Sequence, residues 1–276
     1  MSRLLAVDGD SFAHRAYHGL PKTTSRAGGR PAGALVGFTT MLARLWTQET
    51  PDAVLVGWDT LTAPTYRHEA FPAYQSGRVF DDALLEQLEL LPEIVRAAGL
   101  AAAKKAGYEA DDFLAAAAQA WPDEVLVATS DRDAFQLVSD RVTILQPVKG
   151  VSELARIGPG EVRQRYGVDP EQVPDLIALR GDPSDKLPGA RGVGPKTAAR
   201  LLQQYGTLEA LLADGRFPAE AEDLRLYRRI ATMDASAPLP PLTHQTPTWA
   251  GASSFLRELG MDQTAERLAE IVRSTS

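Results

Sequence analysis

The chain has 276 residues, of which 44% are hydrophobic and 24% charged, and this balance suits a soluble globular protein with a sizeable core. It contains no cysteine, which excludes disulfides, thiol catalysis and zinc–thiolate sites, and we see no apolar stretch suited to a signal peptide or membrane span. The net charge of −7 argues against a nucleic-acid partner unless the acids are gathered around metal ions.

The first part of the chain alternates predicted strands with predicted helices. Short apolar runs predict strands at 4–8, 53–59, 124–131 and 142–146, and helical patterns cover 32–46, 84–98 and 109–121. This alternation predicts a mainly parallel α/β sheet, whose active site lies beyond the carboxyl ends of the strands. Three of the strands end in Asp8, Asp59 and Asp131, so these acids are expected to meet at one edge.

Strand patterns stop after about residue 170. Helices are predicted at 171–179, 194–205, 207–213, 219–233 and 262–272, with a proline-rich break at 237–242. We therefore expect an α/β core at 1–170 and a smaller helical, DNA-binding region at 171–276.

Acidic side chains recur in short motifs along the whole chain. Taken singly, each acid has an ordinary structural interpretation as a helix cap or turn residue. YEADD suits the start of a helix, and TSDRD places two acids two residues apart after a strand, where extended backbone would point both to one side. The nominated set is Asp8, Asp59, Glu109, Asp111, Asp112, Asp131, Asp133, Asp182 and Asp185.

Together these acids indicate a cation site. Carboxylates crowded into one cleft repel one another, so they require positive charge nearby. Oxygen ligands without cysteine, and with four histidines that show no ligand spacing, favour Mg²⁺ or Mn²⁺ over zinc. Two such ions suit the hydrolysis of phosphate esters.

The segment GARGVGPKTAARLL, at 189–202, is typical of a helix–hairpin–helix, with bounds of about 187–205. Its glycines permit close approach of the backbone to a phosphate, and its first helical turn offers free N–H groups. A plain Gly-rich loop before a helix is the alternative. The DNA contacts expected here come from Arg191, Gly192, Gly194, Lys196, Thr197 and Arg200.

Two further segments mix cations with aromatic or glycine residues. Residues 63–78 carry Tyr66, Tyr74, Arg67 and Arg78, a mixture suited to stacking on single-stranded nucleic acid, although a surface loop with core anchors is the alternative. Residues 23–31 form a basic, Gly-rich loop that suits either duplex contact or a flexible linker.

In order and spacing, these motifs resemble the 5′ nuclease family, which includes the 5′→3′ exonuclease domain of bacterial DNA polymerase I and the flap endonucleases. The match runs from VDGDSFAHRAYHGL through TTSR, RHEAF, GYEADD, TSDRD and GDPSDKLPG to GVGPKTA. The resemblance implies a PIN-like core with a C-terminal helical region, and a helical arch at about 64–92. It also implies DNA contacts from Arg15, Arg67 and Arg78.

The resemblance assigns the nine acids to two metal ions. Asp8, Asp59 and Asp111 fall nearer the first ion, and Asp131, Asp133 and Asp182 nearer the second. Glu109, Asp112 and Asp185 act partly through water. A K⁺ site near Gly192 and Gly194 is implied as well.

Two positions depart from the family pattern. The family usually reads Tyr-Lys-x-x-Arg in the arch, whereas this chain has Gln75 between Tyr74 and Arg78, so the lysine that helps to hold the scissile phosphate is missing. Lys186 stands where the family often has Asn, and a cation there is expected to weaken the second ion. Gln75 and Arg78 are nonetheless placed with the six acids nearer the ions as catalytic residues.

The sequence thus predicts a 5′→3′ exonuclease or flap endonuclease acting on 5′ ends, flaps and branched DNA in replication or repair. The alternatives are a catalytically weakened DNA-binding protein of the same fold and a PIN-like ribonuclease. We expect a monomeric, cytoplasmic, nucleoid-associated bacterial protein, with a separate DNA polymerase as a candidate partner and no membrane association. The chain ends about where the family's nuclease domain ends, which suits either a stand-alone nuclease or part of a larger protein.

Overall fold

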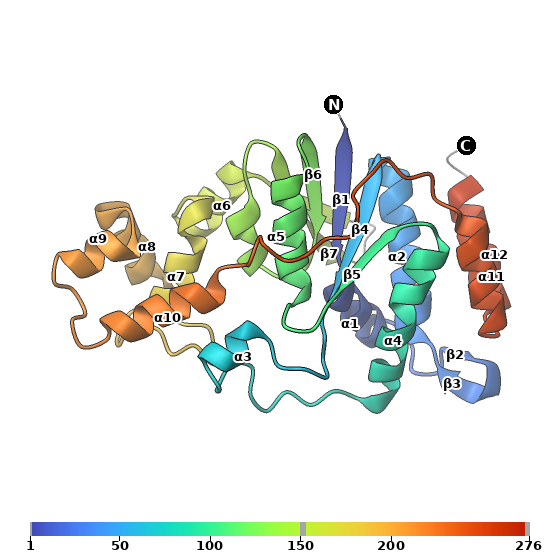
Figure 1. Ribbon diagram of the computed structural model, residues 1–276, viewed down its shortest axis with the longest axis horizontal. Coiled ribbons are helices and arrows are strands. Elements are labelled where there is room, and N and C mark those ends of the chain that lie inside the picture. The colour runs from blue at the N-terminus through green and yellow to red at the C-terminus, as the bar shows by residue number, and fades with distance from the viewer. Residues whose placement is uncertain (1, 150–152, 274–276) are drawn as a thin grey trace.

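A six-stranded sheet forms the centre of the protein (Figure 1). The structure, a computed structural model, describes residues 2–149 and 153–273. The strand order is β5-β4-β1-β6-β7-β8, and every pairing is parallel except that of β7 with β8. The strands are β1 (Arg3–Asp8), β4 (Ala53–Trp58), β5 (Ala101–Lys104), β6 (Glu124–Ala128), β7 (Val142–Lys149) and β8 (Glu153–Ile157). The predicted mainly parallel sheet is confirmed.

Two of these strands carry no clear strand pattern in the sequence. β5 is three alanines and a lysine, and β8 mixes charged and apolar residues at the edge of the sheet. Both pair with only one neighbour, so their conformation depends on the sheet rather than on local propensity. A separate two-stranded sheet, β2 (Ser25–Arg26) with β3 (Arg30–Pro31), flanks the short helix η1 (Ala27–Gly29) in the Gly-rich loop.

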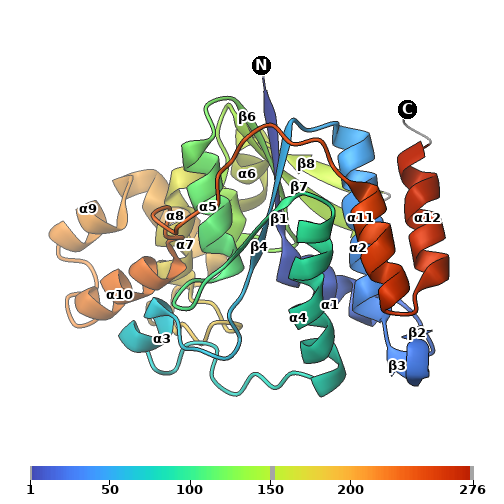
Figure 2. The same cartoon turned by 45° about the vertical axis from the view of Figure 1, so that its right-hand side comes forward.

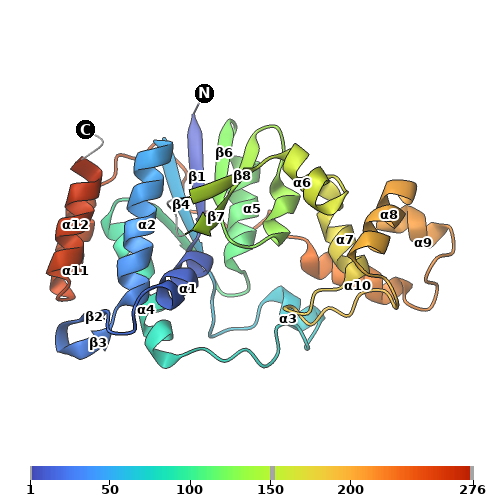
Figure 3. The same ribbon diagram turned by 180° about the vertical axis from the view of Figure 1, so that it is seen from behind.

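Alternate residues of the central strand face two separate cores. Leu5 and Val7 pack with α1 (Gly9–Gly19), α2 (Gly33–Glu49) and α4 (Asp82–Ala97), which lie on one face of the sheet. Leu4 and Ala6 pack with α5 (Ala110–Ala120) on the other face. Figures 1 and 3 show α5 and α2 on opposite sides of the sheet. Burial on both sides explains why the strand reads as a continuous apolar run.

The helical region extends from the α5 side of the sheet. It comprises α6 (Pro159–Tyr166), the short η3 (Pro170–Gln172), α7 (Val173–Arg180), α8 (Pro195–Tyr205), α9 (Leu208–Ala213) and α10 (Ala221–Ala231). α7 and α8 pack together and are joined by the predicted glycine-containing hairpin, so the helix–hairpin–helix arrangement is present.

The last two helices leave this region and return to the core. α11 (Trp249–Glu258) and α12 (Asp262–Arg273) pack against α4 and α2, as Figure 2 shows. The connecting segment is held to the core where the backbone N–H of Gln245 donates to the Asp52 carbonyl at 2.8 Å. The expected helical region at 171–276 is therefore divided in its packing, because the apolar faces of α11 and α12 complete the core around α2.

The expected helical arch is helical only near its ends. α3 (Tyr66–Ala70) is a single turn, residues 71–81 are irregular, and α4 then begins. Pro72 lacks a backbone donor, and Gln75 and Gly77 take positive φ values of 49° and 81°, which ends helical structure. Figure 1 shows this segment running beneath the carboxyl ends of the strands. Among the described residues, no helix is long and apolar enough to cross a membrane.

Candidate active site

A cavity of about 480 Å³ opens at the carboxyl edge of the sheet. Eight of the nine predicted metal ligands line it, and they come from segments spread between residues 8 and 185. They are Asp8, Asp59, Glu109, Asp111, Asp131, Asp133, Asp182 and Asp185. The parallel arrangement of β4, β1 and β6 brings the ends of these neighbouring strands to one place, which is why acids far apart in sequence meet.

Asp8 stands at the centre of the site, at the end of β1. It also caps α1, because its Oδ1 accepts a hydrogen bond from the Ser11 N–H at 2.9 Å, and its Oδ2 accepts from Thr129 Oγ1 at 2.7 Å. Burial, reinforced by the charges of Asp59 and Asp131, raises its pKa to about 7. Asp8 therefore caps α1 and also lines the cavity, and its role as a metal ligand stays a prediction.

Asp10 is a site residue that the sequence reasoning missed. It lines the same cavity, is 7% exposed, and its Oδ2 accepts the Asp59 N–H at 2.7 Å. Burial, followed by the charge of Asp59, raises its pKa well above the ordinary range. The available clue was its position two residues after Asp8, at the start of a helix whose N-terminus faces the strand ends.

The N-terminus of α5 supplies the next acids. Glu109 and Asp112 form a capping box, so the expected capping role is present. Glu109 also accepts hydrogen bonds from Thr65 Oγ1 at 3.0 Å and Tyr74 Oη at 2.9 Å. Burial raises the pKa of Glu109 to about 7, and burial raises that of Asp111 well above its ordinary value, in both cases against the opposing effect of Arg67.

Arg67 is a correction to the predicted DNA contacts. Only 1% of the residue is exposed, and its guanidinium is held by Asp112, Asp111 and the Ile230 carbonyl. A side chain with these partners neutralises the acids of the cavity wall, which it also lines, rather than meeting a strand of DNA at the outer surface. Glu109 lies 3.4 Å from the same guanidinium.

Asp112 is likewise corrected as a metal ligand. It is fully buried, does not line the cavity, and accepts hydrogen bonds from Arg67, Tyr66, and the backbone N–H groups of Glu109 and Asp234. These donors saturate both oxygens. Its structural role is to hold Arg67 and the start of α5 in place.

The acids after β6 adopt a turn rather than the expected extended geometry. A turn follows β6, the short helix η2 (Asp133–Leu137) begins at the second acid, and the Asp133 N–H donates to Asp131 Oδ1 at 2.8 Å. Both side chains nevertheless line the cavity. Burial and the charges of Asp131 and Asp182 raise the pKa of Asp133 well above its ordinary value.

The turn after α7 closes the opposite side of the cavity. Asp182 and Leu187 pair across it, with both backbone hydrogen bonds at 2.8 Å, and Asp182 Oδ1 accepts from the Ser184 N–H at 2.8 Å and from its hydroxyl. Asp185 points to the irregular segment at 71–81, called the crossing segment below, where its Oδ1 accepts from Gln75 Nε2 at 3.0 Å. Lys186 is exposed and does not line the cavity, so the expected cation beside the second ion is absent from the described lining.

Gln75 and Arg78 reach the cavity from the crossing segment at 71–81. Gln75 Nε2 donates to Tyr74 Oη at 2.7 Å, and Arg78 Nη1 donates to Gln75 Oε1 at 2.7 Å. Arg78 Nη2 is 3.5 Å from Asp185, and 44% of its side chain is exposed. An exposed guanidinium beside a wall of acids is suited to contact a phosphate.

The site is acidic enough to require cations, but it is not a finished coordination sphere. Among the described residues, no three acidic or histidine side chains are close enough to form a ready-made metal site. The acids instead accept hydrogen bonds from residues such as Ser11, Thr129 and Gln75. Asp111 Oδ1 is the exception, since it is buried without a hydrogen-bond partner. Because Mg²⁺ keeps several waters and few direct carboxylates, this spread of oxygens fits hydrated Mg²⁺ or Mn²⁺.

The glycines of the hairpin have two different roles. Gly189 packs against Gly181, where an added Cβ would lie 2.3 Å from the Gly181 nitrogen, so its small size serves internal packing and not the expected approach to a phosphate. Gly192 and Gly194 face open space, and Gly194 caps α8 before Pro195. These two positions remain accessible to a phosphate backbone.

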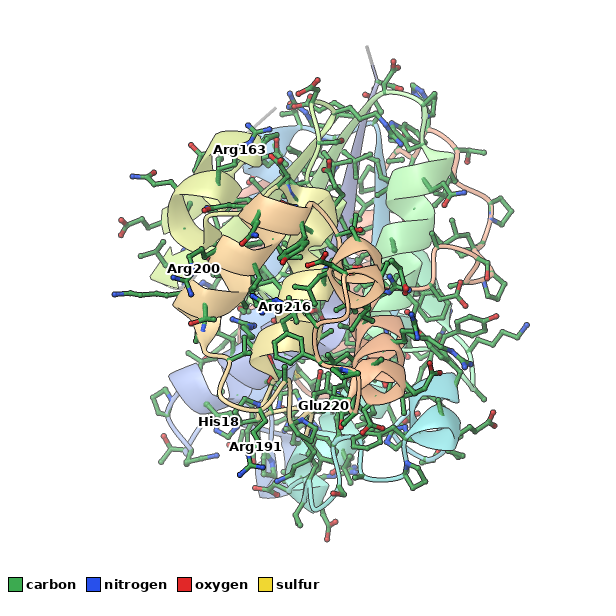
Figure 4. All side chains as sticks on the ribbon, turned by 90° about the vertical axis from the view of Figure 1, so that its left-hand side faces the viewer. His18, Arg163, Arg191, Arg200, Arg216 and Glu220 are labelled. Atoms are coloured by element: carbon green, nitrogen blue, oxygen red, sulfur yellow. The ribbon has the colours of Figure 1, made fainter. Side chains whose placement is uncertain are left out.

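The hairpin cations lie on the surface. Arg191, Lys196 and Arg200 are exposed, and Figure 4 shows Arg191 and Arg200 on the side formed by the helical region. The Arg191 backbone N–H donates to Glu220 Oε2 at 2.8 Å. On α1, Arg15 is half-buried and donates to the Val148 carbonyl at 3.2 Å. Their predicted DNA contacts, and that of Thr197, stay predictions.

Family models match nearly the whole chain in two consecutive parts. Residues 3–167 match the 5′-3′ exonuclease N-terminal resolvase-like domain, and residues 168–250 match the 5′-3′ exonuclease C-terminal SAM fold. This chain belongs to the 5′-3′ exonuclease family. Membership confirms the resemblance read from the motifs and makes the protein a nuclease by family.

Curated relatives of this 5′-3′ exonuclease family member are bacterial DNA polymerases I. The enzyme of Mycobacterium bovis is 44% identical over 214 residues, which cover 76% of this chain and 24% of that protein. The enzyme of Thermus aquaticus is 40% identical over 251 residues, covering 86% of this chain and 29% of that protein. The chain thus spans about a quarter of the length of these relatives.

Solved structures share the fold at low sequence identity. A T5 5′-exonuclease described with bound zinc ions has a TM-score of 0.69 and 18% identity, covering 99% of this chain and all of the other. Human GEN1 in complex with Holliday junction DNA has a TM-score of 0.64 and 15% identity, covering 99% of this chain and 72% of the other. These likenesses support the PIN-like nuclease fold.

Proposed function

We propose that this family member is a Mg²⁺- or Mn²⁺-dependent nuclease that hydrolyses DNA phosphodiester bonds at 5′ ends, flaps and branches in a 5′→3′ direction. The observation that supports it most strongly is the cavity at the strand ends, where eight predicted ligands and Asp10 converge. Such a concentration of buried carboxylates is unfavourable without bound cations, and oxygen donors suit hard divalent ions.

Two ions are proposed, held by acids on opposite walls. Asp8, Asp59 and Asp111 would hold the first, and Asp131, Asp133 and Asp182 the second, with Glu109 and Asp185 acting through water. When bound, two divalent ions lower the pKa of a water and neutralise charge on the attacking and leaving oxygens. Asp10 fixes the backbone at Asp59, so it acts as a positioning residue.

The remaining residues of the cavity position the substrate. Arg78 and Gln75 donate to the scissile phosphate from the crossing segment, because both carry N–H groups at the cavity wall. The buried Arg67 stabilises the acids at the start of α5. Catalysis of this type depends mainly on position and charge neutralisation, which are the two things that these side chains supply.

Duplex DNA would be held at the hairpin, about the open backbone of Gly192 and Gly194, with Lys196, Thr197 and Arg200 in the first turns of α8. A K⁺ ion at this hairpin is part of the proposal. Contacts of this kind are made to phosphates and are independent of sequence. Lys196→Ala is expected to lower the salt dependence of DNA binding by about one unit of slope, measured by titration at several salt concentrations.

We further propose a role in replication or repair, as a cytoplasmic, nucleoid-associated monomer with a DNA polymerase as a candidate partner. The packing is consistent with one α/β unit and one helical unit, divided near residue 170. The helices α11 and α12 return to the α/β unit.

The deciding experiment uses a 5′-flap substrate and a blunt duplex, each labelled at either end, with Mg²⁺, Mn²⁺ or EDTA. Mononucleotide products indicate exonuclease activity and flap-length products indicate endonuclease activity. Asp131→Asn is expected to lose at least about 100-fold in rate, since it removes charge from the second metal group. Intact DNA with the parent protein in every metal would overturn the proposal.

The second candidate is a weakened DNA-binding protein of the same fold, and Gln75 is the observation that favours it, since a neutral amide replaces the family's usual lysine. It predicts binding to flap DNA without metal-dependent cleavage. A PIN-like ribonuclease would instead cleave the matching RNA substrate in preference to DNA.

A further inference from the structure

A second cavity, of about 290 Å³, adjoins the acidic one. His14, Arg78 and Phe80 line both, so the two cavities meet along these side chains. The additional walls come from α1, from the loop that follows it and from the start of α4. A strand whose phosphate reaches the acidic cavity can therefore continue into the second one.

Aromatic and apolar surfaces form much of this second cavity. The rings of His14 and Phe80 lie with centroids 5.6 Å apart, and those of Tyr17 and His18 with centroids 5.3 Å apart. Beside them, Val79 is 93% exposed and offers an apolar surface to the second cavity. Such surfaces are suited to stacking against a nucleobase, which every base can do.

Cationic and N–H-bearing groups form the rest. Lys22 Nζ lies 3.8 Å from the centre of the Tyr17 ring, and Arg78 is 44% exposed. The imidazoles of His14 and His18 carry N–H donors in either protonation state. Asp81 is the one acid among the described lining residues.

The carboxylate of Asp81 accepts two hydrogen bonds from neutral donors and lies near Lys22 and His18. Its Oδ2 accepts from Tyr17 Oη at 2.6 Å and its Oδ1 from the Ala83 N–H at 2.9 Å, so it caps α4 and orients the tyrosine. Two full cations oppose this single acid. The second cavity is therefore suited to an anion, whereas the neighbouring cavity is lined by nine acids.

We propose that this second cavity, lined by His14, Tyr17, His18, Lys22, Arg78 and Phe80, binds the 5′-terminal nucleotide of the strand being degraded, with its terminal phosphate. Lys22 and His18 contact the terminal phosphate, and Phe80 with Val79 covers the base. Because the cavity adjoins the acidic cavity, it can hold a nucleotide next to the scissile phosphate, and the proposal assigns it to the 5′ side. This inference rests on the proposed nuclease function and adds a preference for phosphorylated 5′ ends.

The test compares two blunt duplexes that differ only in a 5′-phosphate or a 5′-hydroxyl. We expect kcat/KM to be at least about tenfold higher on the phosphorylated end, which corresponds to one charge-assisted contact of about 1.4 kcal/mol. Lys22→Ala and His18→Ala should each reduce this ratio to below about threefold. His244→Ala is the matched control, since His244 lies on an exposed linker outside both cavities, and it should keep the ratio.

A binding measurement separates this inference from the proposed function. In EDTA, the affinity of the Asp131→Asn protein for the two duplexes is compared by fluorescence anisotropy, with and without Lys22→Ala. Tighter binding of the phosphorylated end that is lost with Lys22→Ala supports the cavity even if no DNA is cleaved. Equal binding of the two ends, or kcat/KM values for the two ends within twofold of each other, overturns the inference about the second cavity. Equal cleavage of both ends still leaves the proposed nuclease function intact.

Discussion

Arg67 and Asp112 form a two-pronged ion pair beside the acidic cavity, with Nη1 2.9 Å from Oδ2 and Nη2 2.8 Å from Oδ1. The pair is buried, and the same guanidinium also holds Asp111 at 3.1 Å. One arginine from α3 thereby fixes the acidic N-terminus of α5. The site is built on this internal charge pairing as much as on the strand ends.

Removing Arg67 is expected to unfold the site rather than only weaken substrate binding. Arg67→Ala leaves Asp112 buried without its cation, and this should lower the free energy of unfolding by about 3–5 kcal/mol. Urea denaturation followed by circular dichroism measures the change. Arg78→Ala is the control, because its exposed pair with Asp185 should contribute less than about 1 kcal/mol. Equal stability losses in the two variants would contradict this view of Arg67.

Stability without metal is expected to fall as pH rises towards 7. Asp8 and Glu109 have pKa values raised to about 7, so between about pH 4 and pH 7 the folded protein binds more protons than the unfolded chain. The free energy of unfolding then decreases with rising pH, by at most about 1.4 kcal/mol per pH unit for each group.

Saturating Mg²⁺ should remove most of this pH dependence, because cations replace the protons. Urea denaturation at pH 5, 6, 7 and 8, in EDTA and in Mg²⁺, measures both slopes. A flat profile in EDTA would show that the raised pKa values have no effect on folding.

Asp10→Asn is expected to stabilise the metal-free protein. The amide oxygen can still accept the Asp59 N–H, while the cost of burying or protonating the Asp10 carboxylate beside Asp59 disappears. We expect the unfolding free energy in EDTA to rise by about 1 kcal/mol, and the further gain on adding Mg²⁺ to become smaller. Thermal unfolding with and without Mg²⁺ measures this. A lower Tm in EDTA would show that the carboxylate is needed for the fold.

The parts of the site that the sequence predicted are those set by local pattern and sheet topology. Asp8, Asp59 and Asp131 could be placed together because each follows a strand, and parallel strands end at one edge. Arg67 and Asp112 were misinterpreted because their burial arises only when α3 packs beside α5 and α10. Nothing in the local sequence distinguishes a buried arginine from a surface one.

Backbone conformation explains other failures of the sequence reasoning. The crossing segment was expected to be helical, but Gln75 and Gly77 take positive φ values, and Gln75 contacts Asp185, which is distant in sequence. The short strand β5 was missed because alanines carry little strand preference. The helix α11 was not predicted, and α12 was predicted only as part of the helical region, since an amphipathic pattern does not indicate which element the helix packs against.

Lys186 carries a conformational cost that the sequence did not reveal. It is exposed and has φ of +61°, a left-handed conformation that Asn tolerates better than Lys. Lys186→Asn is expected to raise the free energy of unfolding by about 0.5–1 kcal/mol, with Mg²⁺ affinity unchanged within about twofold. Denaturation and isothermal titration calorimetry test the two parts. A gain in Mg²⁺ affinity above about fivefold would restore the expectation that this cation weakens the second ion.

Gln75→Lys is expected to speed cleavage. The amide at this position donates to Asp185 and Tyr74, and an ammonium there would add a full positive charge beside the scissile phosphate. A charge-assisted hydrogen bond contributes about 1.5–3 kcal/mol, so kcat/KM on a 5′-flap substrate should rise by roughly tenfold or more. Gln75→Met, which has similar length and no charge, is the control and should be slower than the parent. If kcat/KM of the lysine variant is unchanged while its fold and flap binding are also unchanged, the neutral side chain is not what limits the rate. Asp185 then holds the added charge away from the phosphate.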